Sequence, residues 1–295
     1  MASTYQIVAE DFFDELNALR LLVTNSNSSE NGPRVRIAAA NSATLLLAAT
    51  FEEFVREMAR EFARAVVAST PSFERLPSKM ASTAWKRTMD GLSKIRFEND
   101  QAPVGQEGIF RAAHSRFSVI YEFCKGDLSQ DIYRDLIHNE NNMRPVELNG
   151  LFKLSGLGDI CKKISDKVSI LDVFGEVEPD KAHGKLISNL EGFFERRNAI
   201  AHALNPGQSS GSNQIMNDID LFESFATALF QTLDIFAPAP ILLADNNLAS
   251  LSVTEENAGD ASAVPDLQNT FLFEINQTGG NVTSPLAPFD PSQIG

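Results

Sequence analysis

One short segment combines residue types that could act together on a phosphate group: Arg197 and Asn198, followed by His202. On an α-helix, residues five positions apart lie about 140° apart around the axis, so Arg197 and His202 fall on neighbouring faces. Asn198 and His202 are four positions apart, where their side chains can meet. The segment therefore offers a charge clamp, an orienting amide and a proton-transfer group.

These three groups suit the cleavage of RNA, which carries its own nucleophile, the 2′-hydroxyl. The reaction needs a base for the hydroxyl proton, an acid for the leaving 5′-oxygen and a cation for the crowded phosphate. Histidine titrates near neutrality and suits the first two roles, and the arginine fork matches phosphate oxygens. This chemistry requires no metal or other cofactor, and we expect none.

Other interpretations of the segment stay open at this stage. His202 could end its helix and interact with the C-terminal dipole. Arg196 precedes Arg197 and gives an alternative spacing to the histidine, so the sequence does not decide which arginine is the partner of His202.

Several common sites are absent from the sequence. There is no Gly-x4-Gly-Lys-Ser/Thr loop, and Gly156 and Gly158 follow no strand pattern that would indicate a dinucleotide fold. The four histidines, at 114, 138, 183 and 202, show no metal-ligand spacing such as His-Glu-x-x-His. We therefore predict neither a metal centre nor a nucleotide cofactor.

Helical periodicity predicts the elements that must position the segment. The longest pattern covers 34–68 and has apolar positions at Leu45, Leu46, Ala49, Phe54 and Met58. Further helices are expected at 5–23, 80–95, 106–123, 128–138, 147–155, 157–171, 179–204 and 214–236. Residues 239–295 are acidic and rich in Asn, Ser, Pro and Gly. We expect an all-α domain over 1–238 and an acidic tail over 239–295, disordered or weakly β.

The charge is unevenly distributed along the chain. It has 25 Lys and Arg against 39 Asp and Glu, a net charge of −14. From Ala203 onward there are eleven acidic residues and no Lys or Arg. Most of the net charge of −14 thus belongs to the last third, so a basic patch for nucleic acid remains compatible with the first 202 residues.

Composition also bears on location. The two cysteines, Cys124 and Cys161, form no disulfide framework or Cys-x-x-Cys pair. The N-terminal residues lack a secretory signal pattern, and no stretch approaches the length of a membrane span. We expect a cytoplasmic protein without membrane contact.

Three segments resemble one known family. The stretch from Glu195 to His202 resembles the HEPN superfamily of helical domains, whose signature is an Arg, usually followed by a polar residue, four to six positions before a His. The stretch from Leu45 to Arg56 resembles a helix of its RiboL-PSP-type branch, and that from Asn141 to Leu157 resembles a mid-domain element of the same branch. The resemblance covers about 35–236.

The resemblance implies a HEPN-like bundle with a four-helix core and extra helices. It also implies a homodimer in which two Arg…His motifs face each other and form a composite, metal-independent endoribonuclease site. By position, Arg197 would bind the scissile phosphate, His202 would transfer protons and Asn198 would orient one of them. Cleavage of cellular or phage RNA would fit a bacterial toxin or anti-phage defence role, with an antitoxin or defence partner protein.

Supporting residues follow from the same resemblance. Glu52 or Glu53 matches an acidic position that lies near the motif in some members, although a solvated helix face explains either residue equally well. Asn142 and Arg144 could line the groove or form a helix-capping turn before Pro145.

Two further questions remain open. The helix over 34–68 carries Arg56, Arg60 and Arg64 along one stripe, and we expect ion pairs with neighbouring glutamates rather than an RNA track. The family also includes inactive modules, so a non-catalytic interaction or RNA-binding protein is the alternative to a ribonuclease.

Overall fold

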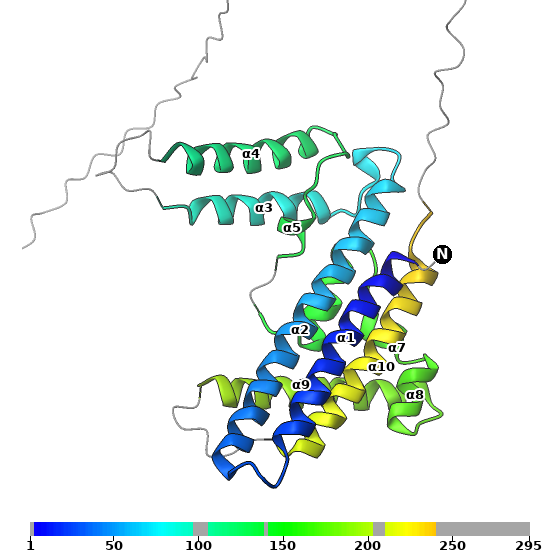
Figure 1. The fold of residues 1–295 in the computed structure, drawn as a ribbon. Helices are drawn as coiled ribbons and strands as arrows, with labels where there is room; N and C mark the ends of the chain where they lie inside the picture. The colour runs from blue at the N-terminus through cyan, green and yellow to red at the C-terminus, as the bar shows by residue number, and fades with distance from the viewer. Residues whose placement is uncertain (1–2, 97–105, 139–140, 203–209, 240–295) are drawn as a thin grey trace, which may run out of the picture. The chain divides into compact units, whose positions relative to one another are not determined.

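The structure is a computed structural model that describes residues 3–96, 106–138, 141–202 and 210–239. Its elements within these ranges are ten α-helices and one 3-10 turn, with no strand. Three long helices run side by side: α1 (Thr4–Ser26), α2 (Pro33–Ala68) and α10 (Ser212–Phe236) (Figure 1). A fourth long helix, α9 (Pro179–His202), crosses them. The predicted all-α bundle is confirmed.

Shorter elements complete this unit. The 3-10 turn (Phe73–Arg75) leads to a hairpin of α3 (Met80–Ser93) and α4 (Glu107–Cys124), which projects from one end of α2 (Figure 1). The short helices α5 (Tyr133–Leu136), α6 (Pro145–Leu154), α7 (Ile160–Ile164) and α8 (Val168–Phe174) then connect the hairpin to α9. No helix within the described ranges is long and apolar enough to cross a membrane.

Phe51 lies at the centre of the core. Its ring centroid is 4.2 Å from that of Phe222, 5.2 Å from that of Phe225 and 6.3 Å from that of Phe194. The Phe51 side chain therefore contacts both α9 and α10 from α2. Because buried aromatic rings stabilise a fold by their area and by their edge-to-face geometry, this cluster fixes where α9 crosses α2.

The predicted buried face of α2 was partly wrong. Leu46 is 50% exposed and Ala49 is exposed, whereas Leu47 and Phe51 are fully buried. Helix α2 is covered by α1 and α10 on one side and by α6 and α9 on another, so its buried surface is wider than one stripe. The exposed side of its first half carries apolar residues.

Two predicted helices differ from the structure. The element expected over 128–138 is helical only at Tyr133–Leu136, because Asp127 and Asp131 accept hydrogen bonds from the backbone N–H groups of Ser129 and Tyr133 and form turns. The element expected over 157–171 is two helices, α7 and α8. The Ser165 hydroxyl donates to the Cys161 carbonyl at the end of α7.

The sequence predicts an acidic tail over 239–295, and residues 240–295 of it lie outside the described residues. We propose that residues 1–238 fold independently of the rest. A chain ending at residue 238 is expected to keep the full-length free energy of unfolding, measured by urea denaturation.

A chain ending at residue 230 serves as the comparison. It loses Leu233, which is fully buried in α10, and should lose stability by several kcal/mol through the cavity and the exposed core. A clear loss of stability in the chain ending at residue 238 would contradict the proposed boundary.

Candidate functional site

The two neighbouring arginines of α9 have different partners. Arg196 Nη2 donates to both carboxylate oxygens of Asp218 on α10, at 2.7 and 2.9 Å. Only 6% of the Asp218 side chain is exposed. Burial raises the pKa of Asp218, and the positive charge of Arg196 opposes that rise. Arg196 therefore ties α9 to α10, and its guanidinium is committed to a buried carboxylate.

Arg197 is held by an amide instead of a carboxylate. Its Nη1 donates to Asn198 Oδ1 at 3.1 Å. The same oxygen accepts a hydrogen bond from Asn142 Nδ2 at 2.9 Å. Within the described part of the chain Arg197 forms no ion pair, in contrast to Arg196. Its charge is therefore not committed to a carboxylate, while its position is fixed.

The Asn142 contact brings a second segment into the site. Asn142 and Arg144 precede α6, which begins with Pro145 at its first position, where the ring pre-sets the helical angle. Arg144 Nη1 donates to Glu191 Oε2 on α9 at 2.6 Å. Two contacts thus fasten the start of α6 along α9, one at Glu191 and one at Asn198.

Glu52 is the acidic residue that reaches this site. Its side chain is 12% exposed, and Arg56 Nη2 donates to its Oε2 at 3.2 Å. Burial raises the pKa of Glu52, while the charges of Arg56 and Arg197 and the backbone N–H of Met143 oppose the rise. Glu52 is therefore close enough to Arg197 to interact with its charge.

Glu53 belongs to a different surface. It is paired with Arg56 and Arg60, at 2.9 and 2.8 Å, on the outer side of α2. Farther along the helix, Arg60 also pairs with Glu57, and Arg64 with Glu61. These contacts confirm the prediction that the arginine stripe is paired with neighbouring glutamates.

His202 is the last residue of α9 and is exposed. The residues after it, 203–209, lie outside the described ranges. Among the described residues no hydrogen bond joins His202 to Asn198, whose Oδ1 accepts from Arg197 and Asn142. The imidazole is thus open to a ligand or to a second protein chain.

Three buried polar atoms at the site lack hydrogen-bond partners among the described residues: Glu52 Oε1, Arg196 Nε and Arg197 Nε. A buried polar atom without a partner costs free energy. Such costs are typical of functional sites, where a fold keeps groups for a purpose other than stability. Within the described ranges, no group of three or more His, Cys, Asp or Glu side chains is arranged so that it could hold a metal ion.

The sequence of the chain matches the model of one family. The model of the RiboL-PSP-HEPN family matches residues 10–234. The chain belongs to this family. The match covers all four long helices and the segment from Asn141 to Arg144, and it begins nearer the N-terminus than the predicted resemblance. Domains of this family often dimerise and bind RNA. No curated protein and no solved structure is significantly similar to this chain.

The structure brings together Glu52 of α2, Asn142 before α6, and Arg197 and Asn198 of α9. Sequence reasoning missed Asp218 and Glu191, the carboxylates that hold Arg196 and Arg144. Asp218 stands at a position of α10 that is otherwise apolar in pattern, and an acid within such a face is the signal that could have identified it.

The separate roles of the two arginines lead to a prediction about stability. Arg196→Ala should lower the free energy of unfolding by roughly 3 kcal/mol, because Asp218 would remain buried without its partner. Arg197→Ala should cost only about 1 kcal/mol, the usual net value of one hydrogen bond. Urea denaturation of both variants at neutral pH measures the difference. Equal losses would mean that both arginines serve the fold.

The raised pKa of Glu52 predicts a pH dependence. A carboxyl with a raised pKa in the folded state favours folding when protonated, and this contribution is lost as the pH rises through its folded pKa. A glutamine at position 52 cannot ionise, so the Glu52→Gln variant avoids this loss of stability. The variant should therefore gain stability relative to the unmodified chain as the pH rises from acid to neutral. Urea denaturation across this range tests the sign, and a relative loss would show that the ion pairs outweigh burial.

Proposed function

We propose that this protein is a metal-independent endoribonuclease whose reacting groups are Arg197 and His202. The proposal rests mainly on the different hydrogen-bond partners of two adjacent arginines. Arg196 is neutralised by a buried carboxylate, whereas Arg197 is positioned by Asn198 and has no described carboxylate as an ion-pair partner. A guanidinium that is fixed in place and bound to no carboxylate, on the same helix as an exposed imidazole, is suited to an anionic substrate.

The proposed reaction uses the substrate's own hydroxyl. A base removes the proton from the 2′-hydroxyl, the 2′-oxygen attacks phosphorus, and the bond to the 5′-oxygen breaks as an acid protonates that leaving oxygen. His202 supplies the proton transfers, and Arg197 binds the non-bridging oxygens as charge builds on the phosphate. The products are a 2′,3′-cyclic phosphate and a free 5′-hydroxyl. The charge of Glu52 and the amide of Asn198 keep Arg197 in place.

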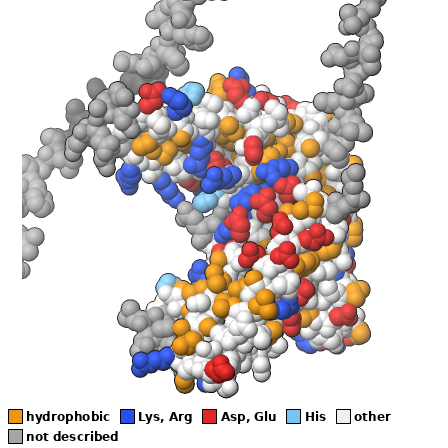
Figure 2. All heavy atoms as spheres, in the orientation of Figure 1, with side chains coloured by type: hydrophobic (Ala, Val, Ile, Leu, Met, Phe, Trp, Pro, Cys, Tyr) orange, Lys and Arg blue, Asp and Glu red, His pale blue; other side chains and the backbone are white. Residues whose placement is uncertain are grey.

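Two histidines are better suited to this reaction than one, and a symmetric dimer would supply them. Exposed apolar residues occur on both helices that carry the site: Leu46 of α2 is 50% exposed, and Ala49 of α2 and Ala199 and Ala201 of α9 are exposed. Figure 2 shows hydrophobic side chains gathered on the face of the molecule around the end of α9. We propose that this surface forms the dimer interface, which brings both motifs into one composite site.

The first test is cleavage of total RNA and tRNA with EDTA present. The unmodified chain should cut RNA and leave cyclic-phosphate or 3′-phosphate ends. Arg197→Ala and His202→Ala should each lose at least about 100-fold in rate, since each removes a group that acts in the transition state.

Matched controls are Arg111→Ala and His114→Ala, which remove an exposed arginine and an exposed histidine on α4. These should cut at the normal rate. An absence of cleavage by the unmodified chain, with normal folding and assembly, would favour the non-catalytic interaction or RNA-binding module instead.

The dimer is tested separately by light scattering. Leu46→Glu combined with Ala49→Glu should convert a dimer to a monomer and abolish cleavage, because charges would be placed within the apolar interface. Val177→Glu is the control, since Val177 is 89% exposed between α8 and α9. Monomers that still cleave RNA would contradict the composite site.

The biological setting we propose is a bacterial toxin or anti-phage defence system, in which RNA cleavage halts growth and a partner protein restrains it. Growth arrest upon expression of the active chain, but not of Arg197→Ala, is the expected sign of this role. Normal growth during active RNA cleavage would contradict it.

A further inference from the structure

The α3–α4 hairpin and the C-terminal end of α9 project from the same side of the helical unit (Figure 1). Figure 2 shows that this side is hollowed between them, and that Lys and Arg side chains gather on the hairpin side of the hollow. His202 ends α9, so the proposed catalytic group lies at the end of the helix on the opposite side of the hollow.

The hairpin is basic in an acidic protein. From Lys79 to Lys125 the sequence carries eight Lys and Arg against five Asp and Glu, whereas the whole chain has a net charge of −14. On α3, Lys79 and Lys86 are seven positions apart and share one face, together with one acid, Asp90. This face points away from α4, because Trp85 and the buried Ala84 and Thr88 occupy the sides toward α4 and α5.

Within the described residues, the lysines of this face are not ion-paired, whereas the arginines of α2 are. Arg56, Arg60 and Arg64 are all paired with glutamates. Lys79 and Lys86, by contrast, are exposed and form no ion pair with the residues that the structure describes. An exposed cation without a carboxylate partner keeps its full charge for a phosphate.

Helix α5 carries a further exposed cation, Arg134, beside the hairpin. Arg134 lines a cavity of about 500 Å³ together with Arg116 and His138. Arg116 is neutralised there by Asp135, through Nε at 2.9 Å, and Asp131 also lines the cavity. Arg134 has no ion-pair partner in the described ranges.

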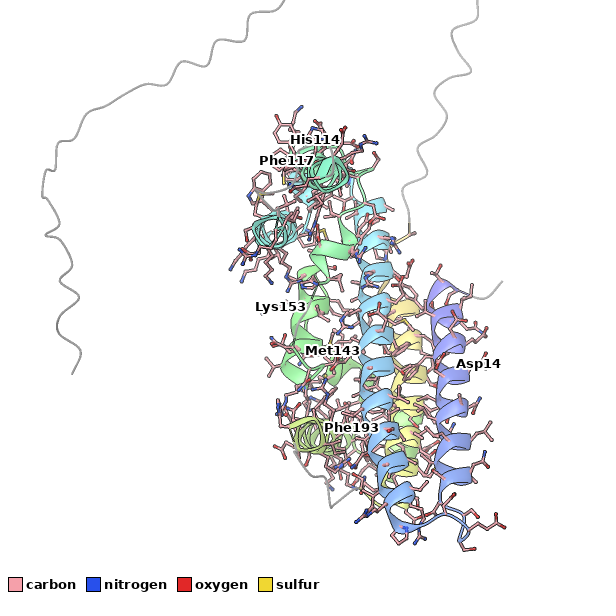
Figure 3. All side chains as sticks on the ribbon, turned by 60° about the vertical axis from the view of Figure 1, so that its left-hand side comes forward. Asp14, His114, Phe117, Met143, Lys153 and Phe193 are labelled. Atoms are coloured by element: carbon pink, nitrogen blue, oxygen red, sulfur yellow. The ribbon has the colours of Figure 1, made fainter. Side chains whose placement is uncertain are left out.

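The segment after α5 links this surface to the proposed catalytic centre. It leads directly to Asn142, whose amide donates to Asn198 beside Arg197. Figure 3 shows Met143, just before α6, and Lys153, near its end, between the hairpin above and Phe193 of α9 below, so α6 lies between the hairpin and α9.

We infer that the hollow binds the phosphate backbone of RNA away from the cleaved bond, through Lys79, Lys86 and Arg134. The substrate is then an extended RNA chain, and a dinucleotide lacks the part that reaches the hairpin. Contacts of cations with phosphates position a nucleic acid without reading its sequence. This inference rests on the proposed function, because it places the cleaved bond at Arg197 and His202.

The test measures RNA binding and its salt dependence without cleavage. A fluorescent RNA strand with every 2′-hydroxyl methylated is titrated with the full chain in EDTA, and fluorescence anisotropy gives the affinity at several salt concentrations. The variant Lys79→Gln/Lys86→Gln/Arg134→Gln should bind more weakly. Its logarithmic salt slope should fall by about two, since three phosphate contacts to a single strand are lost.

The control removes three exposed cations that are each paired with a glutamate: Arg111→Gln and Lys125→Gln at α4, and Lys181→Gln near the start of α9. Lys125 lies over the Tyr121 ring at 5.2 Å, next to Phe117, which points away from the bundle in Figure 3. The control should keep the salt slope. The chain's only tryptophan, Trp85, packs on Phe117, so its emission verifies that the hairpin is intact. If the triple variant misfolds, Lys86→Gln alone should lower the slope by less than one.

Three results would overturn the inference: an unchanged slope in the triple variant, an equal fall in the control, or no binding of RNA by the unmodified chain. Cleavage decides the proposed function separately. If the unmodified chain cuts RNA but the triple variant keeps the same salt slope, only the inference about the hollow is contradicted. If the triple variant shows the expected change in slope but the unmodified chain never cuts RNA, the proposed function is contradicted. In active protein, the triple substitution should slow the cleavage of long RNA and leave dinucleotide cleavage unchanged.

Discussion

The hydrogen bonds that Asn198 Oδ1 accepts are the contacts on which the rest of the site depends. This oxygen accepts from Asn142 Nδ2 and from Arg197 Nη1, so it joins the start of α6 to the guanidinium that the proposed reaction needs. An amide oxygen can do this without a charge. A carboxylate in the same place would pair with Arg197 and neutralise it, as Asp218 neutralises Arg196. The site therefore separates the positioning of Arg197 from the compensation of its charge.

The core places the charged groups by fixing one helix crossing. Phe51 packs against Phe194 on α9, and against Phe222 and Phe225 on α10. Its neighbour Glu52 then faces Arg197, one helical turn beyond Phe194. Because the aromatic contact and the charge contact are at adjacent positions on α2 and one turn apart on α9, a shift of α9 along α2 would disturb both. The fold thus sets the distance between Glu52 and Arg197 through apolar packing, which ionic strength affects little.

The sequence predicted the helical class because periodicity is a local property. It left two choices open, Arg196 or Arg197 and Glu52 or Glu53. Each choice depends on a rotation of about 100° around a helix and on what lies across from it. The carboxylate that engages Arg196 is 22 positions away in sequence, and no spacing pattern indicates it. The short α5 shows the same limit, since its aspartate turns override a helical pattern.

The most direct measurement of the central claim uses an RNA in which only the nucleotide at a mapped cleavage position lacks its 2′-hydroxyl. The protein is assayed with this strand and with the unmodified strand, in EDTA. If RNA supplies the nucleophile to a centre formed by Arg197 and His202, the substituted position is not cut, while other sites in the same strand are cut at their usual rates. Cleavage at the 2′-deoxy position would contradict this account, because a nucleophile other than the 2′-hydroxyl would then have to attack the phosphate.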